Sequence, residues 1–214
     1  MIVGYSRYLN AIADLIGDRE VVGSGMTHEV ERCRLALTRA AAGESVALVS
    51  SGDPGVYGMA GLVLEIVETE ALAVPVEIIP GVSAAQAVAA RLGAPLMLDA
   101  AYISLSDLLL PWNVIRRRLE AVASADLAVV LYNPRSHKRV TQLAEAAAIF
   151  RQYRPGATPV GIGTAVSTEE ERVVISTLER FLDEQIDMRS TVIIGTSTTR
   201  RIGPWMVTPR GYRL

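Results

Sequence analysis

The sequence predicts an α/β fold, in which β-strands and α-helices alternate along the chain. Two observations indicate this. Short apolar runs rich in β-branched residues are followed by segments with helical spacing, and glycine-rich turns join many of them. In the first half this alternation favours a parallel sheet. The 214 residues, of which 50% are hydrophobic, suffice for one large domain or two small ones.

The first half begins with a short apolar strand that ends at Val3. A helix is expected over residues 27–42. Thr27 can cap it, acidic residues suit its first turn, and Gly43 suits its exit. The next expected elements are a strand in SVALVS (45–50), a helix in MAGLVLEIVE (59–68), a strand in VEIIP (76–80) and a helix in SAAQAVAARLG (83–93).

Residues 94–112 carry two prolines and no clean period, so we interpret them as an interdomain connection. The second half then resumes the alternation. Its expected strands are residues 126–134, 158–164, 171–176, 191–198 and 205–211, and its expected helices are residues 138–150 and 177–186.

Composition excludes several classes of function. The chain has 21 basic and 23 acidic residues, whereas general nucleic-acid binders are usually more basic. No apolar run approaches about 18 residues, and the N-terminus lacks a charged leader with an apolar core, so we expect a cytoplasmic protein without a membrane span. The single cysteine, Cys33, precludes an intrachain disulfide and is expected to be a small buried hydrophobe.

The sequence also lacks the usual motifs of metal sites and of covalent hydrolases. His28 and His137 are the only histidines, and no H-x-x-H or C-x-x-C pattern occurs, so we expect no metal site. Ser50 and Ser51 are not part of a G-x-S-x-G motif.

The loop SSGDPGVYGMAG (50–61) lies between an expected strand and an expected helix, where phosphate is often bound. It lacks the lysine of a P-loop and the spacing of G-x-G-x-x-G, and it places Asp53 where a phosphate would sit. A carboxylate there favours a cation or hydroxyl donors. The alternative, that Asp53 caps the following helix, is equally compatible with the local motif.

A second loop, IIPGVSAAQ (78–86), follows the next expected strand. Ser83 is either a plain helix cap or a ligand contact, and two such loops in successive units favour a shared ligand crevice. Basic residues follow the strand at 126–134, in NPRSHKR, where several guanidiniums would suit a ligand with many carboxylates. The arginines at 116–118 are expected on a helix surface.

Together these segments resemble the tetrapyrrole methyltransferases of cobalamin synthesis. The similarity is greatest to the branch that methylates carbon 17 of precorrin-3B or cobalt-precorrin-3. The matching segments cover nearly the whole chain in order: VGYSRYL, SSGDPGVYGMAGLVLE, IIPGVSAAQAVAARLGAPL, ISLSDLLLPW, LYNPRSHKR and TPRGY. The segments ISLSDLLLPW and LYNPRS are typical of this branch, whereas the GDP loop and PGVSA occur across the superfamily.

The resemblance implies two α/β domains, residues 1–98 and 99–214, with S-adenosylmethionine (SAM) bent into the cleft between them. It also implies a homodimer, a polycarboxylate corrinoid substrate, and methylation at carbon 17 coupled to ring contraction. The implied cofactor-binding residues are Gly52, Asp53, Val56, Ser83, Ala84, Tyr132, Asn133, Gly163 and Thr196. The implied substrate-binding residues are Arg135, Lys138 and Arg210.

The chain departs from the family pattern in three places. Members normally begin with a strand, a GxGPG loop and a helix before VGY, so the expectation is either a misassigned or truncated start or a degenerate protein. GIGTAVSTEEER replaces a basic, glycine-rich run, and Thr196 replaces an asparagine.

Some alternatives therefore stay open at this stage. An rRNA or diphthine methylase is possible within the superfamily, although the near-neutral charge and ISLSDLLLPW argue against it. A truncated, non-catalytic corrinoid-binding or subunit-interaction protein is the alternative from another class. No residue is singled out as the general acid or base of ring contraction; Asp99, Asp107 and His137 are candidates without preference.

Overall fold

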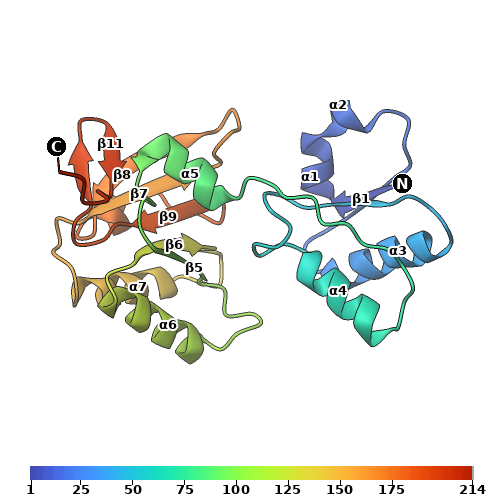
Figure 1. Ribbon diagram of the computed structural model, residues 1–214, viewed down its shortest axis with the longest axis horizontal. Coiled ribbons are helices and arrows are strands. Elements are labelled where there is room, and N and C mark those ends of the chain that lie inside the picture. Colours follow the sequence, from blue (N-terminus) through green and yellow to red (C-terminus); the bar gives the residue numbers. More distant parts are fainter. Residues whose placement is uncertain (214) are drawn as a thin grey trace. The chain divides into compact units, whose positions relative to one another are not determined.

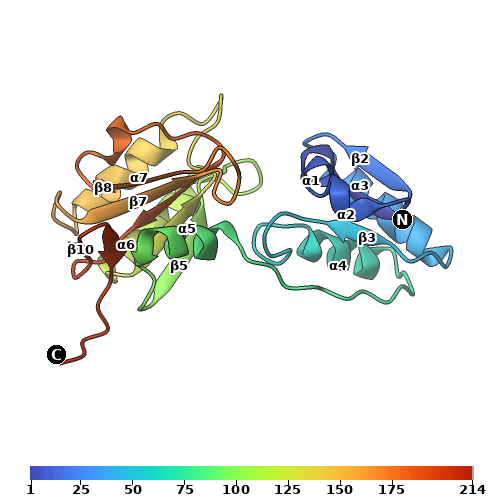
Figure 2. The ribbon, with the colours of Figure 1, turned by 90° about the horizontal axis from the view of Figure 1, so that it is seen from above.

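The computed structural model describes residues 1–213 and divides into two compact units, Met1–Ser83 and Ala84–Leu214. Each unit has its own sheet with helices beside it (Figures 1 and 2), as the α/β prediction required. The division predicted after residue 98 lies later in the chain than this boundary after Ser83. The two boundaries differ because residues 84–92 form a helix that packs on the second unit's sheet.

The first unit contains a parallel three-stranded sheet in the order β2-β1-β3. In the register, Ile2 of β1 lies opposite Val21 of β2 and Ala47 of β3, which confirms the parallel sheet predicted for this half. Its strands are β1 (Ile2–Tyr5), β2 (Val21–Ser24) and β3 (Ala47–Val49). Its helices are α1 (Ser6–Ala11), α2 (Ala13–Ile16), α3 (Glu29–Ala41) and α4 (Ala60–Thr69).

The core of the first unit forms where α3 meets α4. Cys33 and Leu37 are one turn apart on α3, and they pack with Met59, Val63 and Ile66 of the α4 region, whose spacing places them on one helix face. Cys33 is fully buried, as predicted. The N-terminal cap predicted for α3 is wrong, because His28 occupies the cap position and the Thr27 hydroxyl donates to the carbonyl of Met26 instead.

Residues 76–80 do not form the predicted strand. The segment is not paired with any strand among the described residues, and β3 is the edge of the sheet. A groove of about 630 Å³ is lined by β3, by parts of α3 and α4, and by residues 74–81. Since strand structure depends on a hydrogen-bonded neighbour, this apolar segment has no regular secondary structure, and Ile78 and Ile79 are exposed.

The second unit contains a mixed five-stranded sheet in the order β5-β6-β9-β7-β8. Only β5 and β6 run parallel, and the other neighbours are antiparallel. Its strands are β5 (Ala100–Ser104), β6 (Ala128–Tyr132), β7 (Pro159–Thr164), β8 (Arg172–Thr177) and β9 (Ser190–Ile194). A small second sheet joins β4 (Gly93–Ala94), β10 (Arg200–Ile202) and β11 (Trp205–Val207).

Helices cover both faces of the five-stranded sheet. On one face, α5 (Ala84–Leu92) packs against β7, where an added Cβ on Gly161 would lie 2.2 Å from Leu92 Cδ1. On the other face lie α6 (Trp112–Ser124) and α7 (Gln142–Arg151), as Figures 1 and 2 show. Alternate residues of β6 join the two clusters: Val130 packs with α5, and Leu131 packs with α6 and α7.

Three further predictions for this half need correction. Residues 94–112 are not a connection, because they contain β5, which pairs with β6. Residues 177–186 form only a short 3-10 helix, Phe181–Asp183, because the N–H groups of Leu178 and Glu179 bond to carbonyls of residues 158 and 156 rather than within a helix. Helix α7 begins at Gln142, later than predicted.

No helix among residues 1–213 is both long and apolar enough to cross a membrane.

Candidate functional site

The glycine loop after β3 is joined to the loop of residues 80–83 by two hydrogen bonds. The Asp53 N–H donates to Ser83 Oγ over 3.2 Å, and the Gly81 N–H donates to Asp53 Oδ2 over 3.1 Å. Gly52 and Gly81 let the two backbones touch, because a Cβ on Gly81 would lie 2.3 Å from the carbonyl oxygen of Gly52. The two loops singled out in the sequence are thus packed together within the first unit.

Asp53 does not cap the helix that follows it, so that alternative is wrong. Helix α4 starts at Ala60 with Met59 at its cap position. Instead, Asp53 Oδ1 accepts a hydrogen bond from the Gly55 N–H over 2.8 Å, and the other carboxylate oxygen reaches Gly81. A carboxylate has about four acceptor positions, so a half-buried Asp53 keeps capacity for a ligand's hydroxyl or ammonium group.

The rest of this loop is fixed by its own backbone. The Val56 N–H donates to the Asp53 carbonyl, and the Ala60 N–H donates to the Pro54 carbonyl. A Cβ on Gly58 would lie 2.6 Å from the Pro54 carbonyl oxygen, so only glycine fits there. The loop therefore presents a preorganised carboxylate.

In the second unit, Asn133 directly follows β6 and adopts a left-handed backbone with φ of 51°. Its side-chain amide donates to Ser104 Oγ over 3.0 Å, which ties the end of β6 to the end of β5. Its carbonyl accepts a hydrogen bond from Arg139 Nε over 2.8 Å. Burial lowers the pKa of the Arg139 guanidinium, and nearby Asp107 partly offsets that effect.

Tyr132 contacts the start of α5. The Tyr132 hydroxyl accepts a hydrogen bond from the Ala85 N–H over 2.9 Å, which satisfies one of the free N–H groups of the helix's first turn. Ala84 is the first residue of α5 and is exposed. The contacts of Tyr132 with Ala85 and of Asn133 with Ser104 could not be predicted from sequence motifs, because the partners are remote in the chain.

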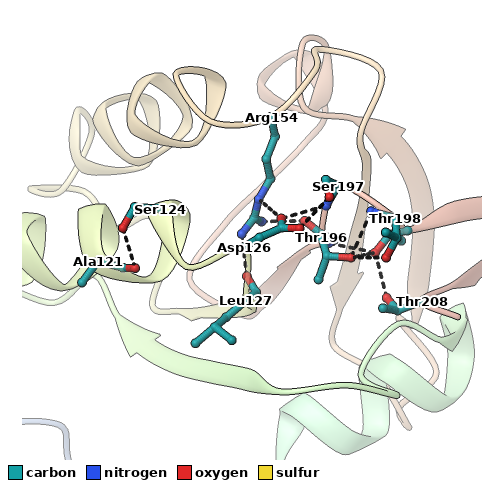
Figure 3. A network of polar contacts seen from close by, with 11 residues as sticks. Ala121, Ser124, Asp126, Leu127, Arg154, Thr196, Ser197, Thr198 and Thr208 are labelled. Atoms are coloured by element: carbon teal, nitrogen blue, oxygen red, sulfur yellow. Dashed lines mark hydrogen bonds and ion pairs between the residues drawn. The ribbon is translucent and has the colours of Figure 1, made fainter. Parts of the chain in front are cut away.

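Gly163 and Thr196 are both buried in the second unit. Gly163 lies on β7, where an added Cβ would be 2.5 Å from Val88 Cγ2 of α5. Thr196 follows β9, and its N–H donates to Thr199 Oγ1 over 2.8 Å. Figure 3 shows Thr196 in a polar network with Thr198, Ser197 and Asp126. The packing of α5 and this network account for both residue types without a ligand.

The three predicted substrate-binding residues lie in two places. Arg135 and Lys138 share the loop after β6, where Lys138 is exposed and Arg135 Nε is buried without a hydrogen-bond partner among residues 1–213. Arg210 follows β11, with its guanidinium carbon 6.0 Å from the centre of the Tyr212 ring. In the described part of the chain, no group of three or more His, Cys, Asp or Glu residues could hold a metal ion.

Comparisons with known proteins found similarity along most of the chain. Residues 1–182 match the family model described as Tetrapyrrole (Corrin/Porphyrin) Methylases. The chain is 46% identical to a probable cobalt-factor III C(17)-methyltransferase of Salmonella typhimurium, covering all of this chain and 89% of the relative. It is 44% identical to a precorrin-3B C(17)-methyltransferase of Sinorhizobium sp, covering 98% of this chain and 85% of the relative.

The crystal structure of the methyltransferase CobJ is also similar, with a TM-score of 0.88 and 37% identity over 97% of this chain and 87% of that one. Another relative is longer. The chain spans 40% of the cobalt-factor III methyltransferase of Priestia megaterium, at 45% identity.

Proposed function

Because the chain belongs to the tetrapyrrole (corrin/porphyrin) methylases, we propose that it is a SAM-dependent C-methyltransferase of corrin-ring biosynthesis. It methylates carbon 17 of precorrin-3B or cobalt-precorrin-3, with contraction of the ring. The observation that carries this proposal is similarity along the whole chain to relatives whose names specify a C(17)-methyltransferase.

The first unit's loops fit the cofactor by their chemistry. SAM carries an ammonium, a sulfonium and ribose hydroxyls, and the Asp53 carboxylate offers acceptors to such groups. Gly52 lies against Ser83, since an added Cβ would be 3.1 Å from Ser83 Cα, and Ser83 keeps the loop in place through its bond to the Asp53 N–H. Val56 completes the proposed contacts from this unit.

In the second unit, the proposed cofactor contacts are Ala84, Tyr132, Asn133, Gly163 and Thr196. Both Gly163 and Thr196 are buried and already bonded: Gly163 pairs with β8 and β9 in the sheet, and the N–H, carbonyl and hydroxyl of Thr196 are hydrogen-bonded to neighbouring threonines. Tyr132 and Asn133 lie where β6 ends, and each is already fixed by a partner.

SAM supplies its own electrophilic methyl group when bound, so the protein's task is mainly to bind, orient and exclude water. Asp53 holds the cofactor from an already rigid loop. Arg135, Lys138 and Arg210 bind substrate carboxylates, which fixes the ring carbon that is presented for methylation. Asp99, Asp107 and His137 stay unassigned candidates for acid–base roles in ring contraction.

Two experiments test the proposal. In isothermal titration, S-adenosylhomocysteine should bind with a dissociation constant in the micromolar range. Incubation with SAM and either precorrin-3B or cobalt-precorrin-3 should then give a product heavier by one methyl group. Failure to bind S-adenosylhomocysteine would contradict the proposal. Binding without methyl transfer would favour the non-catalytic alternative, and methylation of rRNA or a diphthine precursor instead would favour the other superfamily function.

A homodimer and a cytoplasmic location, without nucleic acid as a partner, are further parts of the proposal. They are supported by the resemblance and the charge balance of the sequence. Sedimentation velocity of the purified protein checks the dimer.

A further inference from the structure

Two neighbouring leucines project fully from the second unit, on the loop between β5 and α6. Leu108 is 82% exposed and Leu109 is 100% exposed, although the flanking Leu105 and Leu110 are buried or half-buried against the core. Single exposed leucines are ordinary on protein surfaces, but adjacent ones at the end of a sheet form a patch that favours an apolar contact.

The loop that carries them is held firmly at several points. The Leu105 N–H donates to the Tyr132 carbonyl over 2.9 Å. Gln142 at the start of α7 donates to Asp107 Oδ2 over 3.0 Å, and the Trp112 indole donates to Glu145 over 2.7 Å. Figure 1 shows the loop leaving the sheet before α6 begins. The leucines are therefore presented by an anchored loop.

The loop after β6 lies beside this one, since Asn133 bonds to Ser104 and Gln142 bonds to Asp107. It adds Val140, which is 64% exposed, and the cations Arg135 and Lys138, neither of which forms an ion pair within residues 1–213. Asp107 accepts a hydrogen bond from Gln142 and interacts electrostatically with Arg139. Apolar side chains and uncompensated cations thus occur together where the parallel strands β5 and β6 end.

We infer that Leu108, Leu109 and Val140 form an apolar patch that contacts the macrocycle of the substrate, while Arg135 and Lys138 bind its carboxylates. The inference rests on the proposed function. A polycarboxylate tetrapyrrole has a flat apolar ring edged with anionic groups, and this is the combination that the two loops complement. Leu108 and Leu109 then determine how tightly the ring is held, without a part in binding the methyl donor.

The test uses uroporphyrin, a fluorescent polycarboxylate porphyrin, titrated into the purified chain. The double variant Leu108→Ser/Leu109→Ser should bind it at least about tenfold more weakly, because two buried leucine contacts are lost. The control Leu15→Ser removes a leucine that is 72% exposed in the first unit and should leave binding unchanged. The wild type, the double variant and the control should have the same unfolding temperature, because the substituted side chains are exposed.

A second variant separates the charged contribution. Arg135→Gln should also weaken uroporphyrin binding and should reduce its dependence on salt concentration, because one ion pair is lost. The affinity for S-adenosylhomocysteine should be the same in the wild type and in the leucine variant.

Wild-type affinity in the leucine double variant would overturn the inference and leave the proposed function intact, as would a wild type that methylates its substrate but does not bind uroporphyrin. Unchanged uroporphyrin binding with altered sedimentation of the double variant would assign the patch to contact between copies of the chain. Loss of S-adenosylhomocysteine binding in the wild type would instead contradict the proposed function.

Discussion

Asp53 and Ser83, thirty positions apart, are joined by a hydrogen bond from the Asp53 N–H to Ser83 Oγ over 3.2 Å. The Asp53 carboxylate also accepts the N–H of Gly81, so the two loops support each other. Asp53 therefore combines two roles: it holds the loops of the first unit together, and it keeps acceptor capacity for the proposed cofactor. Substitutions can separate these roles.

Asp53→Asn should weaken S-adenosylhomocysteine binding by about tenfold, because the neutral amide loses charge-assisted hydrogen bonds to the ligand. The fold should change little, since Asn Oδ1 can still accept one of the two backbone N–H groups. Isothermal titration measures the effect, with the exposed Asp18→Asn as control. Equal affinities for both variants would remove Asp53 from the cofactor site.

Gly81→Ala should destabilise the first unit by roughly 1–3 kcal/mol, because the new methyl group would overlap the Gly52 carbonyl. Gly61→Ala is the matched control. It lies in α4 with no heavy atom within 4 Å of an added Cβ, and the change should stabilise the helix by up to about 1 kcal/mol. Urea unfolding compares them, and equal stability of the two variants would refute the close approach of the loops.

Arg154→Leu should cost the second unit roughly 2–4 kcal/mol in unfolding free energy. The guanidinium is buried over the Phe150 ring and donates to the carbonyls of Gly195 and Leu127, with Asp126 3.2 Å from its Nε (Figure 3). Burial lowers its pKa, and Asp126 opposes that shift.

Denaturant unfolding of Arg154→Leu, beside the exposed Arg117→Leu on α6, measures this contribution. The control should stay within about 0.5 kcal/mol of the wild type. A similarly small effect for Arg154→Leu would contradict the role assigned to the buried guanidinium.

The Cys33 thiol should react with a disulfide reagent only when the first unit unfolds. Burial raises the pKa of this thiol above its ordinary value of 9.0, so less thiolate is present in the folded state. Reaction of the thiol with the reagent at pH 8, followed with and without urea, tests this expectation, and rapid reaction without urea would contradict it.

The raised pKa of Cys33 also makes stability depend on pH. It contributes stability that is fully present below pH 9.0 and is lost as pH rises toward the folded pKa, because only the unfolded thiol ionises there. Unfolding titrations of Cys33→Ala and wild type above pH 9 test this dependence.

Limited proteolysis tests where the chain divides. Residues 73–83 lack regular secondary structure, and many of their side chains are exposed, so elastase should cut there and leave a stable fragment that begins near Ala84. The predicted boundary at 98/99 would instead give first cleavage beyond α5. Mass spectrometry of the fragments distinguishes the two.

The sequence by itself determined the features that depend on neighbouring residues. The alternation of strands and helices, the helices at 60–69 and 84–92, the buried Cys33 and the strand before Asn133 all follow from local spacing and turn residues. It also identified the family through motifs that run along the whole chain.

Only the tertiary structure decided what depends on remote partners. Residues 76–80 have a strand's composition but no neighbouring strand, whereas residues 100–104 become a strand because β6 lies beside them. Asp53 resembles a helix cap in sequence, yet its carboxylate bonds to Gly81, and the Asn133 amide bonds to Ser104. The physical reason is the same in each case: a backbone or side-chain hydrogen bond requires a partner at about 3 Å, and folding, not sequence proximity, supplies it.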